Sequence, residues 1–150
     1  SETGRPANHG QTGCAAHLLE WDMEQLGLLN IRTQGSRRFE VIDSEPQKDG
    51  LIVADVLYLD NEPDCEVPAQ FEACVALLKR VVNDLVDKEA DTMRKMVEPP
   101  YQYDSASWVS NRLCEFLPIA NKTKHKLMCL DDPLARLAVV TDYLSRQQVI

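Results

Sequence analysis

The chain of 150 residues lacks any apolar run close to the roughly 20 residues that a membrane-spanning helix needs. Its first residues, SETGRPANHGQTG, are polar and contain no apolar stretch of the kind found in a secretory signal peptide. Aromatic residues are scarce, at 6%, although 44% of all residues are hydrophobic. We therefore expect a globular protein that is neither a membrane span nor visibly exported.

Paired cysteine motifs are also absent. The five cysteines are odd in number, widely scattered and never arranged as C-x-x-C, which argues against a disulfide framework and against a thiol-made zinc site. We therefore predict a reducing, cytoplasmic setting, no structural metal and no cofactor. The cysteines are Cys14, Cys65, Cys74, Cys114 and Cys129.

The short motifs of the common enzyme classes are missing as well. There is no G-x-x-x-x-G-K-[ST] to hold a nucleotide phosphate and no G-x-G-x-x-G for a dinucleotide. There is also no G-x-S-x-G elbow to expose a serine nucleophile. The sequence therefore indicates a protein without catalytic activity.

Positive charge is scarce in the first half of the chain. The formal net charge is −8, and residues 1–66 alone carry 13 acidic and 5 basic side chains. Proteins usually contact phosphate backbones through lysine and arginine, so this balance opposes nucleic-acid binding. Residues 67–150 have equal numbers of acidic and basic side chains.

Glycine is absent after Gly50, and this change divides the chain into two predicted domains. The boundary falls near residues 62–68, which gives a β-domain over 1–66 and a helical domain over 67–150. In the first, four apolar runs separated by turn signals predict an antiparallel meander of hairpins. The runs are Gly13 to Met23, Leu26 to Gln34, Arg37 to Ser44 and Leu51 to Asp60.

The second half has the three- and four-residue apolar spacing of helices. One long helix is predicted over residues 69–98, because this stretch has no glycine or proline and Pro99 and Pro100 would stop it. A second helix is expected from Asp104 or Ser105 to Pro118. A third is expected over about 122–130, and a fourth begins with Asp132 as N-cap and Pro133 at its first position.

Two groups of large apolar side chains could bind peptides. One lies around a predicted turn at Glu24 and Gln25, and the other brackets the helix break at Pro99 and Pro100. Methionine suits such contact surfaces because it is flexible and polarizable. Packing inside the protein is the alternative for both groups. The residues are Trp21, Met23, Leu26 and Leu28 in the first group and Met96, Tyr101 and Tyr103 in the second.

The order of several short motifs resembles the N-terminal family of the Lon protease. The stretch GLLNIRTQGSRRFEV, in which Gly35, Arg38 and Phe39 open a strand, is followed by DGLIVADVLYL. The helical half is similar in its order of Leu-Pro, Lys-Leu and Arg-Leu steps. The segments that carry the resemblance in both halves are Glu20 to Asp22, Gly27 to Val41, Asp49 to Leu59, Leu117-Pro118, Lys126 to Met128, Asp132 and Arg136-Leu137.

The resemblance implies an α+β fold, with a PUA-like antiparallel β-barrel followed by a C-terminal helical bundle. It also implies a role in substrate recognition, without the nucleotide site or the Ser-Lys protease part of full-length Lon. Early apolar strands of that β-domain are missing here, so we expect an incomplete barrel. Four strands can hardly close a barrel, and the open edges predict that these 150 residues alone are poorly soluble or self-associate.

The leading hypothesis is a stand-alone protein that binds unfolded or degron-bearing polypeptides, or a partner protein, and has no catalytic activity. A PUA-like RNA-binding module is the alternative, which the acidic β-half opposes. An unrecognised hydrolase is a third hypothesis, but no converging nucleophile and base can be named for it.

Overall fold

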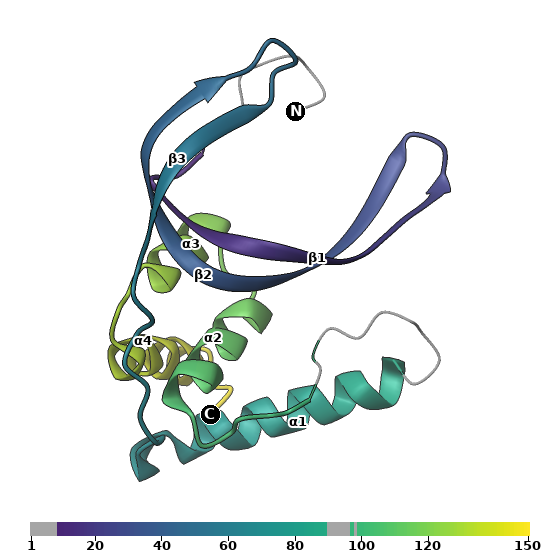
Figure 1. Ribbon diagram of the computed structural model, residues 1–150. Coiled ribbons are helices and arrows are strands. Elements are labelled where there is room, and N and C mark those ends of the chain that lie inside the picture. Colours follow the sequence, from purple (N-terminus) through teal and green to yellow (C-terminus); the bar gives the residue numbers. More distant parts are fainter. Residues whose placement is uncertain (1–8, 90–96, 98) are drawn as a thin grey trace. The chain divides into compact units, whose positions relative to one another are not determined.

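The computed structural model describes residues 9–89, 97 and 99–150. The chain divides into two compact units, Ser1–Asn61 and Glu62–Ile150, a few residues upstream of the boundary expected at residue 66. The first unit contains the strands and the second contains the helices (Figure 1). The fold is therefore of the α+β class, as the sequence predicts.

The first unit is a three-stranded antiparallel sheet. Strand β1 (Thr12–Gln25) pairs with β2 (Leu28–Pro46), which in turn pairs with β3 (Ile52–Tyr58), in the order β1-β2-β3. Gly27 and Gly50 lie in the two connecting turns with φ of 88° and 86°. Only glycine adopts this left-handed region without strain, which explains its place at both turns. The predicted antiparallel meander is confirmed, but it has three strands instead of four, and its first turn lies at Leu26 and Gly27 because β1 continues through the predicted turn at Glu24 and Gln25.

The predicted strands over 26–34 and 37–44 are one continuous strand, β2, so the expected turn at Gly35 is wrong. Gly35 pairs with Ala16 inside the ladder. A Cβ atom at Gly35 would lie 3.3 Å from Sγ of Cys14. This glycine therefore serves a close approach between strands, which sequence reasoning cannot distinguish from a turn.

No residue of the described part of the first unit, residues 9–61, is buried. Among these residues β1 and β3 form opposite edges of the sheet, so they do not close a barrel. The sheet bends through irregularities of the β1–β2 register, between Cys14 and Ala16 and between Leu18 and Glu20. A curved sheet that encloses no core leaves its apolar side chains accessible.

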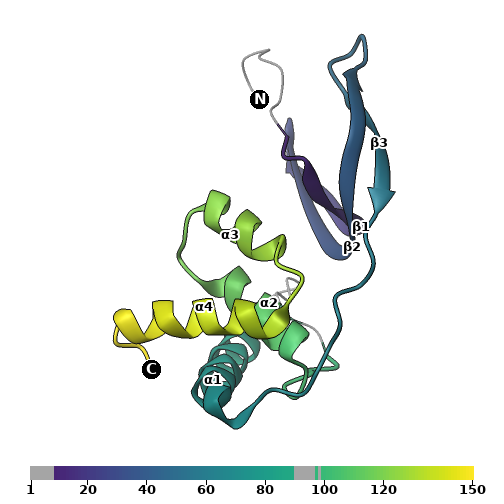
Figure 2. The same cartoon turned by 90° about the vertical axis from the view of Figure 1, so that its left-hand side faces the viewer.

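The second unit begins with a short 3-10 helix, η1 (Ala69–Phe71), which leads into α1 (Glu72–Glu89). Helices α2 (Ala106–Phe116), α3 (Asn121–Met128) and α4 (Pro133–Arg146) follow. Helix α2 packs against each of the other three α-helices (Figure 2). The long helix predicted over 69–98 is shorter, because Val97 is not helical, and positions 90–96 and 98 lie outside the described residues.

The predicted N-caps of two helices are confirmed. The Ser105 hydroxyl accepts a hydrogen bond from the backbone N–H of Trp108 at 2.9 Å. The Asp132 carboxylate accepts one from the N–H of Leu134, also at 2.9 Å. Each cap satisfies a backbone donor that the first turn of a helix leaves unpaired.

The buried apolar side chains of the described residues all belong to the helical unit. They repeat at helical spacing along α1, α2 and α4, as the sequence pattern predicts. The fully or almost fully buried members include Cys74, Leu78, Val82, Val109, Leu113, Leu137, Val140 and Leu144.

A buried ion pair ties the start of this unit to its last helix. The guanidinium of Arg136, 1% exposed, donates to both carboxylate oxygens of Glu62, at 3.0 and 2.5 Å. It also donates to the carbonyls of Leu127 and Leu130 and to the hydroxyl of Ser110. All five donors of an arginine are thereby used. The pair fixes the segment that follows β3 onto the helices.

Among the described residues, no helix is both long enough and apolar enough to cross a membrane.

Candidate functional site

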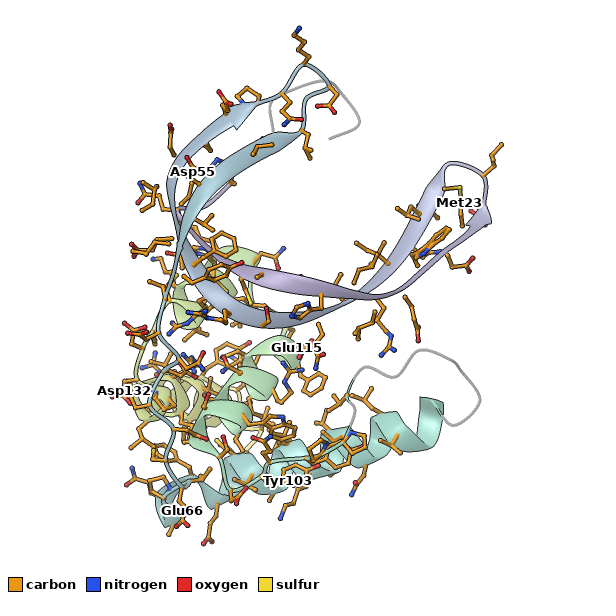
Figure 3. All side chains as sticks on the ribbon, in the orientation of Figure 1. Met23, Asp55, Glu66, Tyr103, Glu115 and Asp132 are labelled. Atoms are coloured by element: carbon orange, nitrogen blue, oxygen red, sulfur yellow. The ribbon has the colours of Figure 1, made fainter. Side chains whose placement is uncertain are left out.

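Large apolar side chains that face solvent are concentrated in the sheet unit. Of the eighteen exposed large hydrophobic residues in the described part of the chain, fourteen lie between Leu18 and Tyr58. Figure 3 shows side chains along both sides of the strands, with Met23 near the end of the β1–β2 hairpin. Soluble proteins rarely leave a large contiguous apolar surface uncovered unless it contacts something. The sheet unit is therefore where a binding surface is to be sought.

The strand register places four of these side chains on one face of the hairpin. Trp21 pairs with Ile31, and Leu18 pairs with Thr33. Paired residues of an antiparallel ladder point to the same side, as do residues two apart along a strand. Leu29 therefore joins Ile31 and Trp21. We call Leu18, Trp21, Leu29 and Ile31 the hairpin face; they are 57%, 67%, 54% and 59% exposed.

The opposite face of the same hairpin is polar. Arg32 donates to both carboxylate oxygens of Glu20, at 3.1 and 2.8 Å, and Asp22 pairs with Asn30. The hydrogen bond from Arg32 lowers the pKa of Glu20 below its ordinary value, although desolvation acts in the opposite direction. The hairpin is thus amphipathic, with one polar face and one apolar face.

The four hairpin residues named from the sequence are all exposed, but they do not share one face. Trp21 lies on the hairpin face. Leu28 pairs with Gln25 and lies on the polar face, the same side of β2 as Asn30 and Arg32. Leu26 occupies the turn and is 102% exposed, and Met23, 46% exposed, lies beside a register irregularity.

Sequence reasoning missed three members of the hairpin face. Leu18, Leu29 and Ile31 sit within apolar stretches in which both alternating sets of positions contain hydrophobic residues. The register, with its extra residue in β1 between Leu18 and Glu20, decides which set shares a face with Trp21. No signal in the sequence locates that extra residue.

The second predicted group forms an aromatic cluster on the helical unit. Tyr101 and Tyr103 lie with their ring centroids 5.9 Å apart, and the Trp108 ring is 5.3 Å from that of Tyr103. The Lys79 ammonium lies 5.2 Å from the centre of the Tyr103 ring, a cation–π distance. Met96, the third predicted member, lies outside the described residues.

The aromatic cluster is only partly accessible. Tyr101 is 36% exposed, whereas Tyr103 and Trp108 are half-buried against the helical core. Burial, followed by the neighbouring Tyr101, raises the pKa of Tyr103. The cluster offers one exposed ring edge, and it is a smaller surface than the hairpin face.

A shallow depression of about 320 Å³ lies between residues 63–65 and 131–134 of the helical unit. Two of the carboxylates that line it are held by backbone donors: Asp64 accepts from the N–H groups of Cys65 and Ser107, and Asp132 accepts from the N–H of Leu134 as the cap of α4. The described residues contain no group of three histidine, cysteine or acidic side chains placed to hold a metal ion. The depression is therefore best explained as a by-product of these caps.

Comparison with known proteins gives a consistent family assignment. Residues 2–146 match the family model of the ATP-dependent protease La (LON) substrate-binding domain. The crystal structure of the Lon N-terminal domain protein from Xanthomonas campestris is similar, with a TM-score of 0.68 and 25% sequence identity. That alignment covers 89% of this chain and 68% of the other.

The N-terminal domain of Mycobacterium avium complex Lon protease is similar in fold, with a TM-score of 0.55 and 18% identity. It is matched over 92% of this chain and 72% of its own. The comparison with curated proteins gave no match.

Proposed function

Because the chain belongs to the family of Lon substrate-binding domains, we propose that it binds apolar segments of unfolded or degron-bearing polypeptides without cutting them. The family membership confirms the resemblance found in the sequence. A role in substrate recognition follows from the family. The nature of the bound segment and the surface that binds it are the proposal.

The observation that supports this most directly is the hairpin face. Its four large apolar side chains are each more than half exposed and share one side of the β1–β2 hairpin. An unfolded polypeptide exposes apolar side chains that a folded one buries, and covering them on such a face removes apolar area from water. The aromatic cluster with Tyr101 and Tyr103 is a second, smaller contact surface in this proposal.

The proposal includes a cytoplasmic setting and the absence of catalysis. All five cysteines are free, as is usual in a reducing compartment. The missing phosphate loop and serine elbow support a binding protein that passes its ligand to another component. RNA binding by a PUA-like barrel is not favoured, because the net charge of −8 would repel a phosphate backbone. The PUA-like assignment itself is also a proposal and rests on the family resemblance.

The test is titration of a fluorescently labelled, reduced and alkylated model polypeptide into the full chain. Trp21→Ala should weaken binding about tenfold, the equivalent of roughly 1.4 kcal/mol. The melting temperature should change little, because the Trp21 side chain is 67% exposed. Val139→Ala on α4 is a matched control, since Val139 is also an exposed apolar residue, 49% accessible, but lies in the other unit.

Two outcomes would contradict this assignment. Loss of folding in Trp21→Ala would mean that the side chain is part of a core. Equal weakening by Trp21→Ala and Val139→Ala would mean that binding does not depend on the hairpin face.

A further inference from the structure

Strand β3 has the properties of a strand that can accept another. It is seven residues long, contains no lysine, arginine, proline or glycine, and pairs only with β2 among the described residues. The β2–β3 irregularity, between Val41 and Asp43, places its extra residue in β2 and leaves β3 regular. Natural edge strands are usually protected by charged side chains, proline or bulges, and of these β3 has only one charged residue, Asp55.

The hydrogen bonds at both ends of β3 show which backbone groups face outward. The N–H of Leu59 donates to the carbonyl of Arg38, and the N–H of Gln47 donates to the carbonyl of Leu51. In an antiparallel ladder, alternate residues bond to the partner strand, so the odd-numbered residues of β3 bond to β2. The N–H and C=O groups of the even-numbered residues therefore point away from the sheet. These residues are Ile52, Ala54, Val56 and Tyr58.

The acidic side chains near the outer edge of β3 determine which kind of strand can pair with it. Asp55 is the central residue of β3 and its only charged one, and its direct partner on β2 is Asp43, so two carboxylates stand side by side (Figure 3 labels Asp55). Glu45, two residues beyond Asp43, lies on the same face opposite Val53. Like charges directly opposite each other destabilise a sheet. A cationic side chain on an added strand would reduce this repulsion.

The same charges disfavour a second copy of β3 as the partner. An antiparallel pair of two β3 strands centred on Asp55 would place Asp55 opposite its own equivalent, beside the existing Asp43. A strand with lysine or arginine opposite Asp55 would instead be attracted by the carboxylates of Asp55 and Asp43. Asp55 would form a non-hydrogen-bonded pair with it, the type in which the side chains come closest.

We propose that the outer edge of β3 binds an extended peptide as an additional antiparallel strand, with a lysine or arginine opposite Asp55 and apolar residues on either side. This rests on the proposed function and specifies the conformation and charge of the bound segment. The residues two positions before and after that cation point to the same face as the cation, so that when they are apolar they would contact Val53 and Leu57, which are 42% and 58% exposed. The Phe39–Tyr58 ring contact and the cation–π contact of Arg37 with Tyr58 anchor the far end of the strand.

The test uses the full chain and two labelled nine-residue peptides of alternating valine and threonine, with either lysine or glutamate at the centre. Fluorescence anisotropy should show the lysine peptide binding about tenfold more tightly than the glutamate peptide. Asp55→Lys should reverse this preference. Asp22→Lys is the matched control, because Asp22 is an exposed acid of β1 in the same sheet. It should leave the preference unchanged.

Hydrogen exchange locates the bound peptide. The amides of Ile52, Ala54, Val56 and Tyr58 should be protected when the lysine peptide is added. Equal affinity for both peptides, or an unchanged preference in Asp55→Lys, would overturn the proposal. Protection of these amides by the chain itself, rising with protein concentration and without peptide, would make a second copy the occupant and would also overturn it.

The two proposals can fail separately. If the model polypeptide binds and Trp21→Ala weakens it, but the β3 amides stay unprotected with the lysine peptide, strand addition is wrong and polypeptide binding stands. If neither the model polypeptide nor either peptide binds, both are wrong.

Discussion

Removing the charge of Glu62 should destabilise the helical unit strongly. In Glu62→Gln the guanidinium of Arg136, 1% exposed, keeps its charge but loses its only ion-pair partner among the described residues. The carboxylate of Glu62 also accepts hydrogen bonds from the Ser107 hydroxyl and from the Asn111 amide. A glutamine amide in its place would point its N–H₂ group at one or more of the groups that now donate to the carboxylate, so those donors would lose their acceptor.

The size of the loss can be estimated from these contacts. Breaking a buried ion pair by removing one partner costs about 3–5 kcal/mol, because the remaining charge is left uncompensated. Glu62 retains 11% side-chain exposure, so some water can reach the site. We therefore expect about 3 kcal/mol for Glu62→Gln, a large part of the roughly 5–15 kcal/mol that stabilises a typical domain.

The assay is urea unfolding followed by circular dichroism at a helical wavelength, which reports on the unit that contains the helices. With a slope near 2 kcal/mol per molar urea, the midpoint should fall by roughly 1.5 M. Asp142→Asn is the control, because the Asp142–Arg146 pair is exposed at 60% and 75%. An exposed i, i+4 pair of this kind is worth about 0.3–0.5 kcal/mol.

The reasoning would be refuted if Glu62→Gln cost no more than Asp142→Asn. A double variant, Glu62→Leu with Arg136→Met, gives a second check. Replacing both charges by apolar side chains should cost less than the two single changes together, because no unpaired charge remains buried.

Three further predictions concern the same unit. Burial raises the pKa of Asp64, but hydrogen bonds from Ser105, Ser107 and Cys65 together lower it by more, so that the pKa lies below its ordinary value. The stability that Asp64 contributes should therefore be present at neutral pH and lost as the pH falls through the lowered folded pKa, so that the difference between the wild type and Asp64→Asn in urea unfolding shrinks in acid. Asp132→Ala should cost about 1 kcal/mol through loss of the α4 N-cap, with Asp132→Ser restoring most of it. Native thiol labelling should modify the exposed Cys14 and Cys65 rapidly, and the buried Cys74 and Cys114 only on unfolding. Burial also raises the pKa of the Cys114 thiol. Rapid native labelling of the buried pair would contradict the packing.

The helical unit could be predicted closely because its signals are local. Asp104 or Ser105 was expected as the N-cap of α2, and Ser105 is the cap; Asp132 as N-cap and Pro133 at the first helical position were expected to start α4. A cap depends on the residues within one turn, and apolar spacing depends on the period of a single helix. Long-range partners were not predictable: nothing near Glu62 indicates that Arg136, 74 residues away, completes its hydrogen bonds.

The sheet was predicted in kind but not in detail. Gly27, Gly35 and Gly50 look alike in the sequence, yet only Gly27 and Gly50 have positive φ, while Gly35 lies inside β2. The candidate site was likewise predicted only in part. Trp21 was identified, whereas Leu29 and Ile31 became its neighbours only through the strand register.

The sequence by itself determined the division into strands and helices, the positions where α2 and α4 begin, the acidity of the first half and the family, because each of these depends on neighbouring residues or on composition. Only the tertiary structure decided which apolar residues form the hairpin face, that Asp43 stands beside Asp55, and that Arg136 is neutralised by Glu62. In a sheet, a shift of one residue in register turns every side chain to the other face. That shift is set by bulges and by pairing between distant segments, which no local pattern encodes.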